Sequence, residues 1–320
     1  MMSLRHAGIR WPDGKSFAFT MFDDTDNATV ENSRPVYILL NELGIKITKS
    51  VWPLRSDPAD MFFAQSLQDD DYLDFVLELK EKGFEIGYHG ARGGSNPRHI
   101  SLEALDLFRE KIGHDPYTYA HHAPALENLY WGRLRTQWPL LGRLAQYCSE
   151  HAKFYGSDPS SSYFWGDLCK KRIKYVRNYG FSSVDLFRCD PWTPYHDPEK
   201  PFVNCWFSTN VWLNANSIEE VLTPARFDQW EESGGLVLMG GHLGQNFSHN
   251  GKVIGSVERT MRLLAEKNGW FAPVGTILDY ISAQRGVHVL THSQSRRLEL
   301  RWAMHMGIKT LRSGLYKRGL

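Results

Sequence analysis

A short apolar segment that ends in three carboxylates, SFAFTMFDDTD at residues 16–26, constrains the fold of this chain more than any other feature. Its phenylalanines and methionine stand among small side chains, which is typical of a strand that is buried on both faces of a parallel sheet. Such sheets belong to α/β folds, in which ligands bind at the carboxyl ends of the strands. We therefore expect Asp23 and Asp24 to lie at a ligand-binding edge, although an isolated acidic pair is more often a solvated turn.

Helix and strand patterns alternate along most of the chain after this segment. Apolar residues at helical spacing predict helices at residues 36–43, 72–82, 101–113, 217–232, 257–267 and 277–284. Apolar segments that predict strands stand at residues 45–52, 84–88, 117–120, 183–187, 202–207 and 236–239. Roughly seven βα units result, which favours a closed or nearly closed barrel over a doubly wound sheet. No glycine-rich phosphate-binding loop follows any of these strands.

The domain organisation follows from the extent of this alternation. No linker divides the chain, and we expect one barrel over residues 1–286. Between residues 124 and 180 the periodicity loosens, which predicts a long insertion with helices around residues 140–153 and 167–179. Beyond the barrel the alternation fades, and residues 287–320 are expected to form a small C-terminal appendage packed on it.

Composition restricts the classes of partner and the cellular setting. The 37 Lys and Arg residues nearly balance the 36 Asp and Glu residues, so the net charge of +1 gives no basis for binding nucleic acid or an acidic membrane surface. No uncharged apolar run approaches the length of a membrane span, and the N-terminus lacks an apolar signal segment, so a cytoplasmic protein is expected. The four cysteines have no CxxC spacing, which favours buried reduced thiols. The oligomeric state is not predicted.

Histidines and an aspartate follow several of the other predicted strands. These residues are His89, His121, His122 and His242, each at a strand end, and Asp190, in a loop after its strand. Because the carboxyl ends of parallel strands meet at one edge, the histidines are expected near Asp23 and Asp24. A single histidine is most often structural, but several imidazoles beside carboxylates are what a metal site with acid and base groups requires.

Several of these segments resemble motifs of the polysaccharide deacetylase family, metal-dependent enzymes that remove N- or O-acetyl groups from sugars. FTMFDDT resembles the motif in which the first aspartate is the general base and the second binds the metal, which implies these roles for Asp23 and Asp24. EIGYHG resembles the strand that carries the first metal-binding histidine, which implies His89. LVLMGGH resembles the strand with the catalytic histidine, which implies His242 as the general acid. CDPW loosely resembles the motif whose acid, here Asp190, orients that histidine.

The resemblance extends over about residues 17–285. Near its end, VERTMRLLAEKNGWFAPVGTILDYI is similar to the closing helix, strand and helix of many such domains. The resemblance implies a distorted (β/α)7 barrel, that is, one of about seven βα units, with a divalent metal ion as cofactor. Carboxylate and imidazole ligands suit zinc, with cobalt and nickel as alternatives.

Two departures from the family pattern affect the site. The family places a second metal-binding histidine shortly after the first, where this chain has Gly93 and Gly94. The arginine that pairs with the base is also absent from its usual place before a proline, where this chain has YAHHAPALENLYWG. The third metal ligand is His122, His121 or His99, or the site has no third ligand. We favour His122, because a strand end brings it to the same edge, whereas strand alternation turns His121 away.

These motifs predict a metal-dependent hydrolase that removes an acetyl group, as an amide or an ester, from a sugar or glycan precursor. The predicted metal ligands are Asp24, His89 and His122, and the predicted catalytic residues are Asp23, His242 and Asp190. A noncatalytic glycan-binding or glycan-assembly barrel with a degraded metal site is an alternative, as is a hydrolase of a non-sugar amide. Trp131, Trp192 and Trp206 are expected in the core rather than against a sugar ring.

Overall fold

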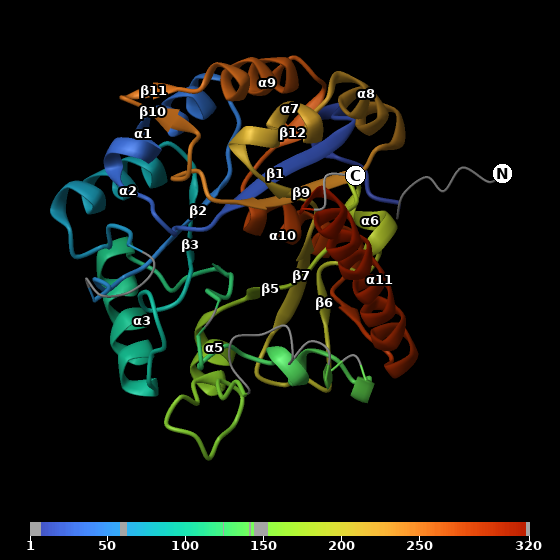
Figure 1. The fold of residues 1–320 in the computed structure, drawn as a ribbon. Helices are drawn as coiled ribbons and strands as arrows, with labels where there is room; N and C mark the ends of the chain where they lie inside the picture. The colour runs from blue at the N-terminus through green and yellow to red at the C-terminus, as the bar shows by residue number, and fades with distance from the viewer. Residues whose placement is uncertain (1–7, 58–62, 124, 141, 144–152, 318–320) are drawn as a thin grey trace.

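The computed structural model describes residues 8–57, 63–123, 125–140, 142–143 and 153–317. They form an α/β structure in which helices surround a largely parallel sheet (Figure 1). The strand order is β13-β6-β7-β5-β4-β3-β2-β1-β9-β8, and β12 pairs with β1 outside this order. The strands of the sheet are β1 (Phe17–Asp23), β2 (Thr48–Val51), β3 (Glu85–Tyr88), β4 (Thr118–Tyr119), β5 (Tyr175–Gly180), β6 (Tyr195–His196), β7 (Cys205–Thr209), β8 (Trp212–Leu213), β9 (Leu236–Gly241), β12 (Gly269–Phe271) and β13 (His288–Val289).

Seven parallel strands of this sheet curve around one core, in the order β9, β1, β2, β3, β4, β5 and β7. Among the described residues no ladder joins β7 to β9, but Asn210, directly after β7, links the two ends. Its backbone N–H donates to the carbonyl of Leu238 at 2.6 Å, and its side-chain oxygen accepts from the Leu238 N–H at 2.6 Å. The sheet is thus a distorted barrel whose ends meet without regular strand pairing.

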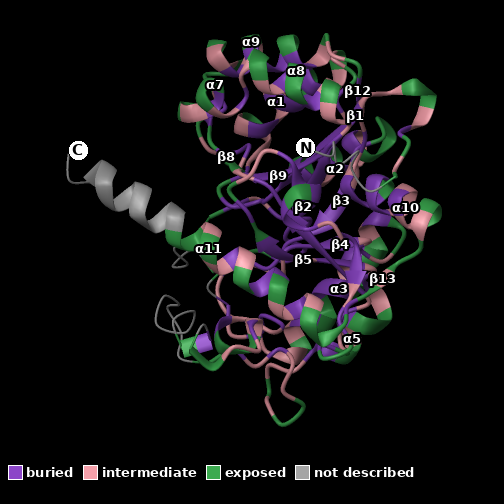
Figure 2. Cartoon of the chain, turned by 90° about the vertical axis from the view of Figure 1, so that its right-hand side faces the viewer, coloured by how far each residue is buried: buried purple, intermediate pink, exposed green. Residues whose placement is uncertain are grey.

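The helices cover the outside of this sheet, and their exposed faces point away from the buried strands (Figure 2). They are α1 (Val30–Glu42), α2 (Asp70–Glu81), α3 (Arg98–Ile112), α5 (Gly166–Arg172), α6 (Leu186–Cys189), α7 (Ile218–Val221), α8 (Pro224–Ser233), α9 (Gly255–Ala265), α10 (Val274–Arg285) and α11 (His292–Lys317). Short 3-10 turns lie at Pro12–Gly14, Gly132–Arg135 and Ala215–Ser217, and a hairpin pairs β10 (Ser248–His249) with β11 (Lys252–Val253). The helix predicted at residues 36–43 begins at Val30, because Thr29 and Asn32 form a capping box there.

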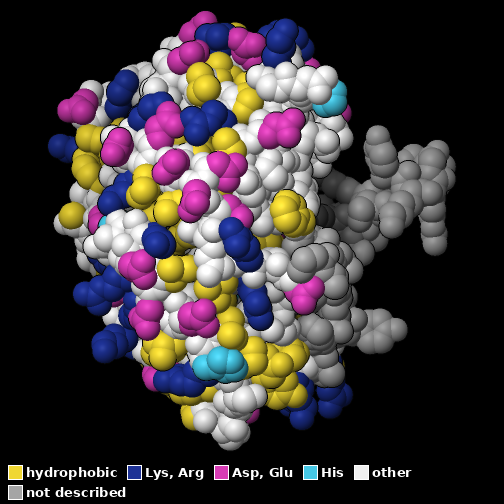
Figure 3. Space-filling view, turned by 90° about the vertical axis from the view of Figure 1, so that its left-hand side faces the viewer, with side chains coloured by type: hydrophobic (Ala, Val, Ile, Leu, Met, Phe, Trp, Pro, Cys, Tyr) yellow, Lys and Arg dark blue, Asp and Glu magenta, His cyan; other side chains and the backbone are white. Residues whose placement is uncertain are grey.

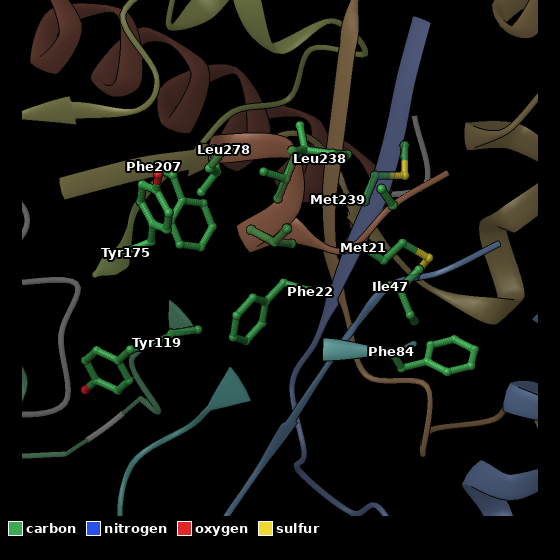
Figure 4. Close-up of a cluster of buried hydrophobic side chains, with 14 of the residues drawn as sticks. Met21, Phe22, Ile47, Phe84, Tyr119, Tyr175, Phe207, Leu238, Met239 and Leu278 are labelled. Carbon is green, nitrogen blue, oxygen red and sulfur yellow. The ribbon is translucent and has the colours of Figure 1, made fainter. Parts of the chain in front are cut away.

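Strand β1 lies at the centre of the packing, as its sequence predicts. Every residue from Phe17 to Asp23 is buried. Phe22 packs against Phe207 of β7 with ring centroids 6.2 Å apart, within a cluster of buried side chains (Figure 4). Since β1 and β7 are not neighbours in the sheet, this contact crosses the barrel interior. The interior is narrow, because a Cβ at Gly87 of β3 would lie 3.2 Å from the ring of Phe22, which comes from a strand that is not paired with β3. Each such buried ring contributes about 1.5–3 kcal/mol to stability.

Two predicted elements in the second half of the chain differ in the structure. The helix predicted at residues 167–179 ends at Arg172, and the following residues form β5, because the interleaved large side chains of YVRNYG fit a strand between β4 and β7. The strand predicted at residues 183–187 is wrong, because the Asp185 carboxylate accepts from the Phe187 N–H at 3.2 Å and starts α6 there. The helix predicted around residues 140–153 lies largely outside the described residues.

The C-terminal segment lies against the barrel and the insertion. Strand β13 pairs with β6, and α11 lies beside α6 (Figure 1). The buried Glu299 of α11 accepts a hydrogen bond from the Thr136 hydroxyl at 2.8 Å and from the Gln137 N–H. These contacts join residues 287–317 to the long segment after β4. The division into a barrel and an appendage stays a prediction.

The surface mixes charges of both signs. On the face shown in Figure 3, acidic and basic side chains are interspersed, as the net charge of +1 suggests. No helix within the described part of the chain is both long and apolar enough to cross a membrane. Cys169, Cys189 and Cys205 are buried and free, and Cys148 lies outside the described residues.

Candidate active site

The carboxyl ends of four strands bring acidic and imidazole side chains together. Asp24 directly follows β1, His89 directly follows β3, and His242 directly follows β9. His122 lies shortly beyond β4. A turn after Asp24, closed by a 2.8 Å hydrogen bond from the Ala28 N–H to the Thr25 carbonyl, brings a further carboxylate, that of Asp26, back to this edge.

Asp23 is fully buried, and both of its carboxylate oxygens are engaged. Oδ2 lies 3.0 Å from the Lys49 ammonium and accepts from the Tyr37 hydroxyl at 2.8 Å. Oδ1 accepts from the backbone N–H of Leu243 at 2.7 Å. Burial lowers the pKa of Lys49, but the adjacent Asp23 carboxylate outweighs it and raises the pKa above its ordinary value. Asp23 and Lys49 therefore form a buried ion pair beneath the edge of the sheet, in which both oxygens of Asp23 already have partners.

Asp24 is paired with an arginine from the opposite part of the barrel. The two terminal nitrogens of Arg177, on β5, donate to the two oxygens of Asp24 at 2.9 and 2.7 Å. The guanidinium also lies 5.4 Å from the ring centroids of Phe22 and Trp212. A two-pronged arginine contact of this kind fixes the plane of the carboxylate as well as its position.

Asp26 is surrounded by imidazoles. Its oxygens lie 3.0 Å from Nδ1 of His122, 3.5 Å from Nε2 of His89 and 2.7 Å from Nε2 of His242. Burial alone would raise the pKa of Asp26, but the three imidazoles lower it far below its ordinary value. This carboxylate, unlike Asp23 and Asp24, has no lysine or arginine beside it among the described residues.

Asp26, His89 and His122 fit a divalent metal ion. Each offers one ligand atom, and these atoms all lie within 4.8 Å of one another. With ligands at about 2.0–2.2 Å from zinc, donors in a tetrahedral site lie about 3.3–3.6 Å apart, close to the distances around Asp26. Both ring nitrogens of His89 are buried and have no hydrogen-bond partner among the described residues, a state that costs about 1–3 kcal/mol per group unless a ligand is bound.

His242 lies at the exposed rim of this cluster. Its side chain is 22% exposed, compared with 1% for His89 and 3% for His122. Its ring packs edge-on against Trp212, with centroids 4.9 Å apart, and Trp212 is itself 37% exposed. Burial lowers the pKa of His242, but the hydrogen bond and charge of Asp26 outweigh it and raise the pKa. His242 is thus the most exposed of these three histidines, and solvent reaches its ring.

The structure brings His89 and His122 together as expected, but it changes the carboxylate beside them. Asp26 occupies the place expected for Asp24, and Asp24 contacts Arg177 instead. The arginine that pairs with an aspartate of this segment therefore comes from β5 rather than from the segment after β4. Asp26 could have been sought from the DTD spacing, whereas Arg177 was hidden in a segment predicted as a helix.

Asp190 does not contact His242 among the described residues. It is fully buried, accepts from the Ser208 hydroxyl at 2.7 Å and from the Trp192 N–H at 3.2 Å, and burial raises its pKa to about 6. The predicted role of Asp190 in orienting His242 is corrected accordingly. The acid that contacts His242 is Asp26.

The other candidate ligands lie elsewhere. His121 turns away from the cluster, where its Nε2 accepts from the Leu129 N–H at 3.2 Å, and burial lowers its pKa. His99 is exposed on α3. Of the three tryptophans considered from the sequence, Trp206 is buried in the core, while Trp131 and Trp192 are partly exposed and pack on His121 and His288.

Comparison with known proteins confirms the predicted fold. The structure is similar to that of a Mycobacterium smegmatis protein described as a polysaccharide deacetylase, with a TM-score of 0.53 and 14% identity over 89% of this chain and 96% of that one. A Bacillus subtilis peptidoglycan deacetylase has a TM-score of 0.40 and 10% identity over 86% and 95% of the two chains. A Bordetella bronchiseptica protein described as a polysaccharide deacetylase involved in O-antigen biosynthesis has a TM-score of 0.38 and 13% identity over 86% and 93%. The fold assignment rests on the first of these.

Sequence comparison gives no further relative. No family model matches the chain. No curated protein matches it either.

Proposed function

We propose that this chain is a metal-dependent hydrolase that removes an acetyl group from a sugar or glycan precursor. The observation that carries the proposal is the grouping of Asp26, His89 and His122, with His242 on the same carboxylate and Asp24 nearby. Such a grouping contains the ligands, the base and the acid that hydrolysis of an amide or ester requires. The fold shared with the Mycobacterium smegmatis protein supports the same class of chemistry.

Asp26, His89 and His122 would hold the metal, for which zinc is the first choice and cobalt or nickel are alternatives. Asp23 and Asp24 are each balanced by a cation of the protein, so Asp26 is the one carboxylate of this segment left to balance a metal charge. When bound, the cation supplies Lewis acidity, which polarises an acyl carbonyl and lowers the pKa of a nearby water.

We assign the general base to Asp24 rather than to Asp23. Both oxygens of Asp23 are already occupied by Lys49, Tyr37 and Leu243. Asp24 is fixed by Arg177, and its Oδ1 lies 3.8 Å from Nδ1 of His89. Each of its oxygens keeps a second lone pair, so Asp24 can accept the proton of the attacking water.

His242 is the general acid. As the water oxygen bonds to the acyl carbon, the bond from that carbon to the sugar nitrogen or oxygen breaks. His242 gives the departing atom a proton, and the products are acetate and the free amine or alcohol. Burial lowers the pKa of His242, but the hydrogen bond to Asp26 outweighs it and raises the pKa, which favours the protonated ring.

The partly exposed Trp212 supports a sugar as the group that carries the acetyl. Its ring lies next to His242 and is 37% exposed, so it offers an apolar face at the rim of the site. Flat aromatic faces of this kind stack on sugar rings.

The test combines metal analysis with acetate release. The purified protein is stripped with a chelator and supplied with zinc, cobalt or nickel, and N- and O-acetylated sugars are offered as substrates. We expect stoichiometric metal and acetate release in the wild type. Metal uptake without hydrolysis of any acetylated compound would favour a noncatalytic glycan-binding barrel.

Two matched variants separate the ligand from the base. Asp26→Asn is expected to lose metal affinity by more than about 100-fold, because even a change behind a ligand costs about 10–100-fold. Asp24→Asn should retain metal and lose turnover. Retained metal in Asp26→Asn together with lost metal in Asp24→Asn would restore the ligand set expected from the sequence.

A further inference from the structure

The chain that carries His242 is held to the end of β1 by three hydrogen bonds. The Asp24 N–H donates to the Gly241 carbonyl at 2.8 Å, and the His242 ring bonds to Asp26 at 2.7 Å. Between them, the Leu243 N–H donates to Oδ1 of Asp23 at 2.7 Å. Of these three, the hydrogen bond between Leu243 and Asp23 depends on a buried ion pair, since the other carboxylate oxygen of Asp23, Oδ2, faces Lys49.

We propose, on the basis of the acetyl hydrolase function above, that Asp23 is a positioning residue, which Lys49 orients so that it fixes the Leu243 amide and through it the His242 ring. The Lys49 ammonium lies 3.0 Å from Oδ2 and the Tyr37 hydroxyl donates to the same oxygen, so Oδ1 is the atom that faces Leu243. The Ser50 hydroxyl donates to the Asp23 carbonyl at 2.7 Å and holds the backbone from the same side. Lys49 and Asp23 are both fully buried, so water does not compete for these contacts.

Lys49 and Asp23 do not touch the reacting atoms in this proposal. Asp23 sits at the last position of β1 and faces Gly241 of β9 in the strand register. A shift of the Leu243 amide therefore moves the residue just before it, His242. A displacement of about 1 Å of a catalytic group costs on the order of 100-fold in rate.

The experiment uses two double variants that differ in one hydrogen bond. Asp23→Asn/Lys49→Met removes both charges but keeps a side-chain oxygen for Leu243. Asp23→Leu/Lys49→Met removes both charges and that oxygen. The single variant Asp23→Asn leaves Lys49 charged, and its amide turns its oxygen to Lys49 and its NH2 group to the Leu243 N–H, which breaks the contact.

We expect kcat to fall by about 100-fold in Asp23→Asn and in Asp23→Leu/Lys49→Met, with KM and metal content retained. Asp23→Asn/Lys49→Met should recover kcat to within about tenfold of the wild type. If Asp23 were instead the general base, kcat would stay low in both Asp23→Asn and Asp23→Asn/Lys49→Met, because asparagine cannot accept the proton of the attacking water. Failure of this recovery would overturn the proposal.

Amide hydrogen exchange tests the proposal without metal or substrate. In the metal-free proteins, the Leu243 amide should exchange at least about tenfold faster in Asp23→Leu/Lys49→Met than in Asp23→Asn/Lys49→Met. Equal exchange in the two would overturn the proposal. If the wild type hydrolyses no acetylated compound but this difference is found, the proposed function fails while the positioning contact stands.

Discussion

The two ends of strand β3 carry polar side chains that differ in their hydrogen bonding. At the first residue, the Glu85 carboxylate accepts from the hydroxyls of Thr48 and Thr118 at 2.7 and 2.8 Å and from the Gly275 N–H at 2.8 Å. Just after the last residue, His89 is buried, and its ring makes no hydrogen bond to the part of the chain that the structure describes. The first end is complete within the protein. The second end has buried ring nitrogens without a hydrogen bond among the described residues, which suits the binding of a ligand there.

The carboxylates at the two ends show the same contrast. Burial raises the pKa of Glu85, because its hydrogen bonds from neutral groups do not offset the loss of water. The pKa of Asp26 is lowered despite burial, because three imidazoles surround it. An acid whose pKa is raised by burial suits a structural link, whereas an acid that is held in its charged form suits a metal ligand.

Replacing His89 should give the largest effect and tests the proposed role of the carboxyl end of β3 most directly. In His89→Leu we expect metal binding to be lost and turnover to fall by about three orders of magnitude or more. The metal-free protein should lose only the attraction between His89 and Asp26, whose facing atoms lie 3.5 Å apart, because the buried ring nitrogens have no hydrogen bond to lose among the described residues. Metal analysis, acetate release and the Tm of the metal-free protein give the three readings.

The matched control is His121, the neighbouring strand-end histidine that has a backbone partner. His121→Leu leaves the buried Leu129 N–H without its acceptor, so it should lower the Tm and retain the metal. A metal-free His89→Leu protein that is less stable than His121→Leu would show that His89 serves the fold.

Replacement of His242, the proposed general acid, has the next largest expected effect. For His242→Ala, turnover should fall by about two to four orders of magnitude while metal content is retained, which is the usual scale for a positioned acid. The exposed His99 on α3 provides the control, since His99→Ala should leave turnover unchanged. Turnover at the wild-type rate in His242→Ala would remove it from the mechanism.

Sequence reasoning predicted the fold better than the site. The strand from Phe17 to Asp23 and the polar strand ends were recognisable, because burial and the α/β alternation leave a local pattern. The pairing of Asp24 with Arg177 was not recognisable, because it joins β1 to β5 across the barrel. Which carboxylate of the DDTD segment faces the histidines depends on the turn after Asp24, and no local pattern reveals that direction.

Glu85→Gln should affect stability and leave the chemistry intact. Glutamine offers one acceptor oxygen to three donors, so we expect a loss of about 1–3 kcal/mol in the free energy of unfolding. Because the folded pKa of Glu85 is raised, its protonated form favours the folded state. This contribution is present below the ordinary value of 4.5 and is lost as the pH rises through the raised pKa. Urea unfolding of both proteins between acidic and neutral pH should therefore show the wild-type advantage shrinking as the pH rises. An advantage that grows with pH would mean that Glu85 is charged and stabilised.

Thr48→Val should give the smallest effect. It tests how much a single hydroxyl contributes to the hydrogen bonds around Glu85, at the amino end of β3. The Thr48 hydroxyl donates to Glu85 at 2.7 Å and accepts from the Val274 N–H at 2.9 Å, at the first turn of α10. Valine has nearly the same shape, so the expected loss of about 1 kcal/mol reflects the hydrogen bonds and the cap rather than packing. Thermal unfolding should show a Tm lower by about 2–4 °C, with metal content and kcat unchanged. Thr48→Ser keeps the hydroxyl and should restore most of the Tm. If Thr48→Val instead lowered kcat at an unchanged Tm, the amino ends of the strands would take part in the chemistry. The separation of a structural amino end from a functional carboxyl end of β3 would then be wrong.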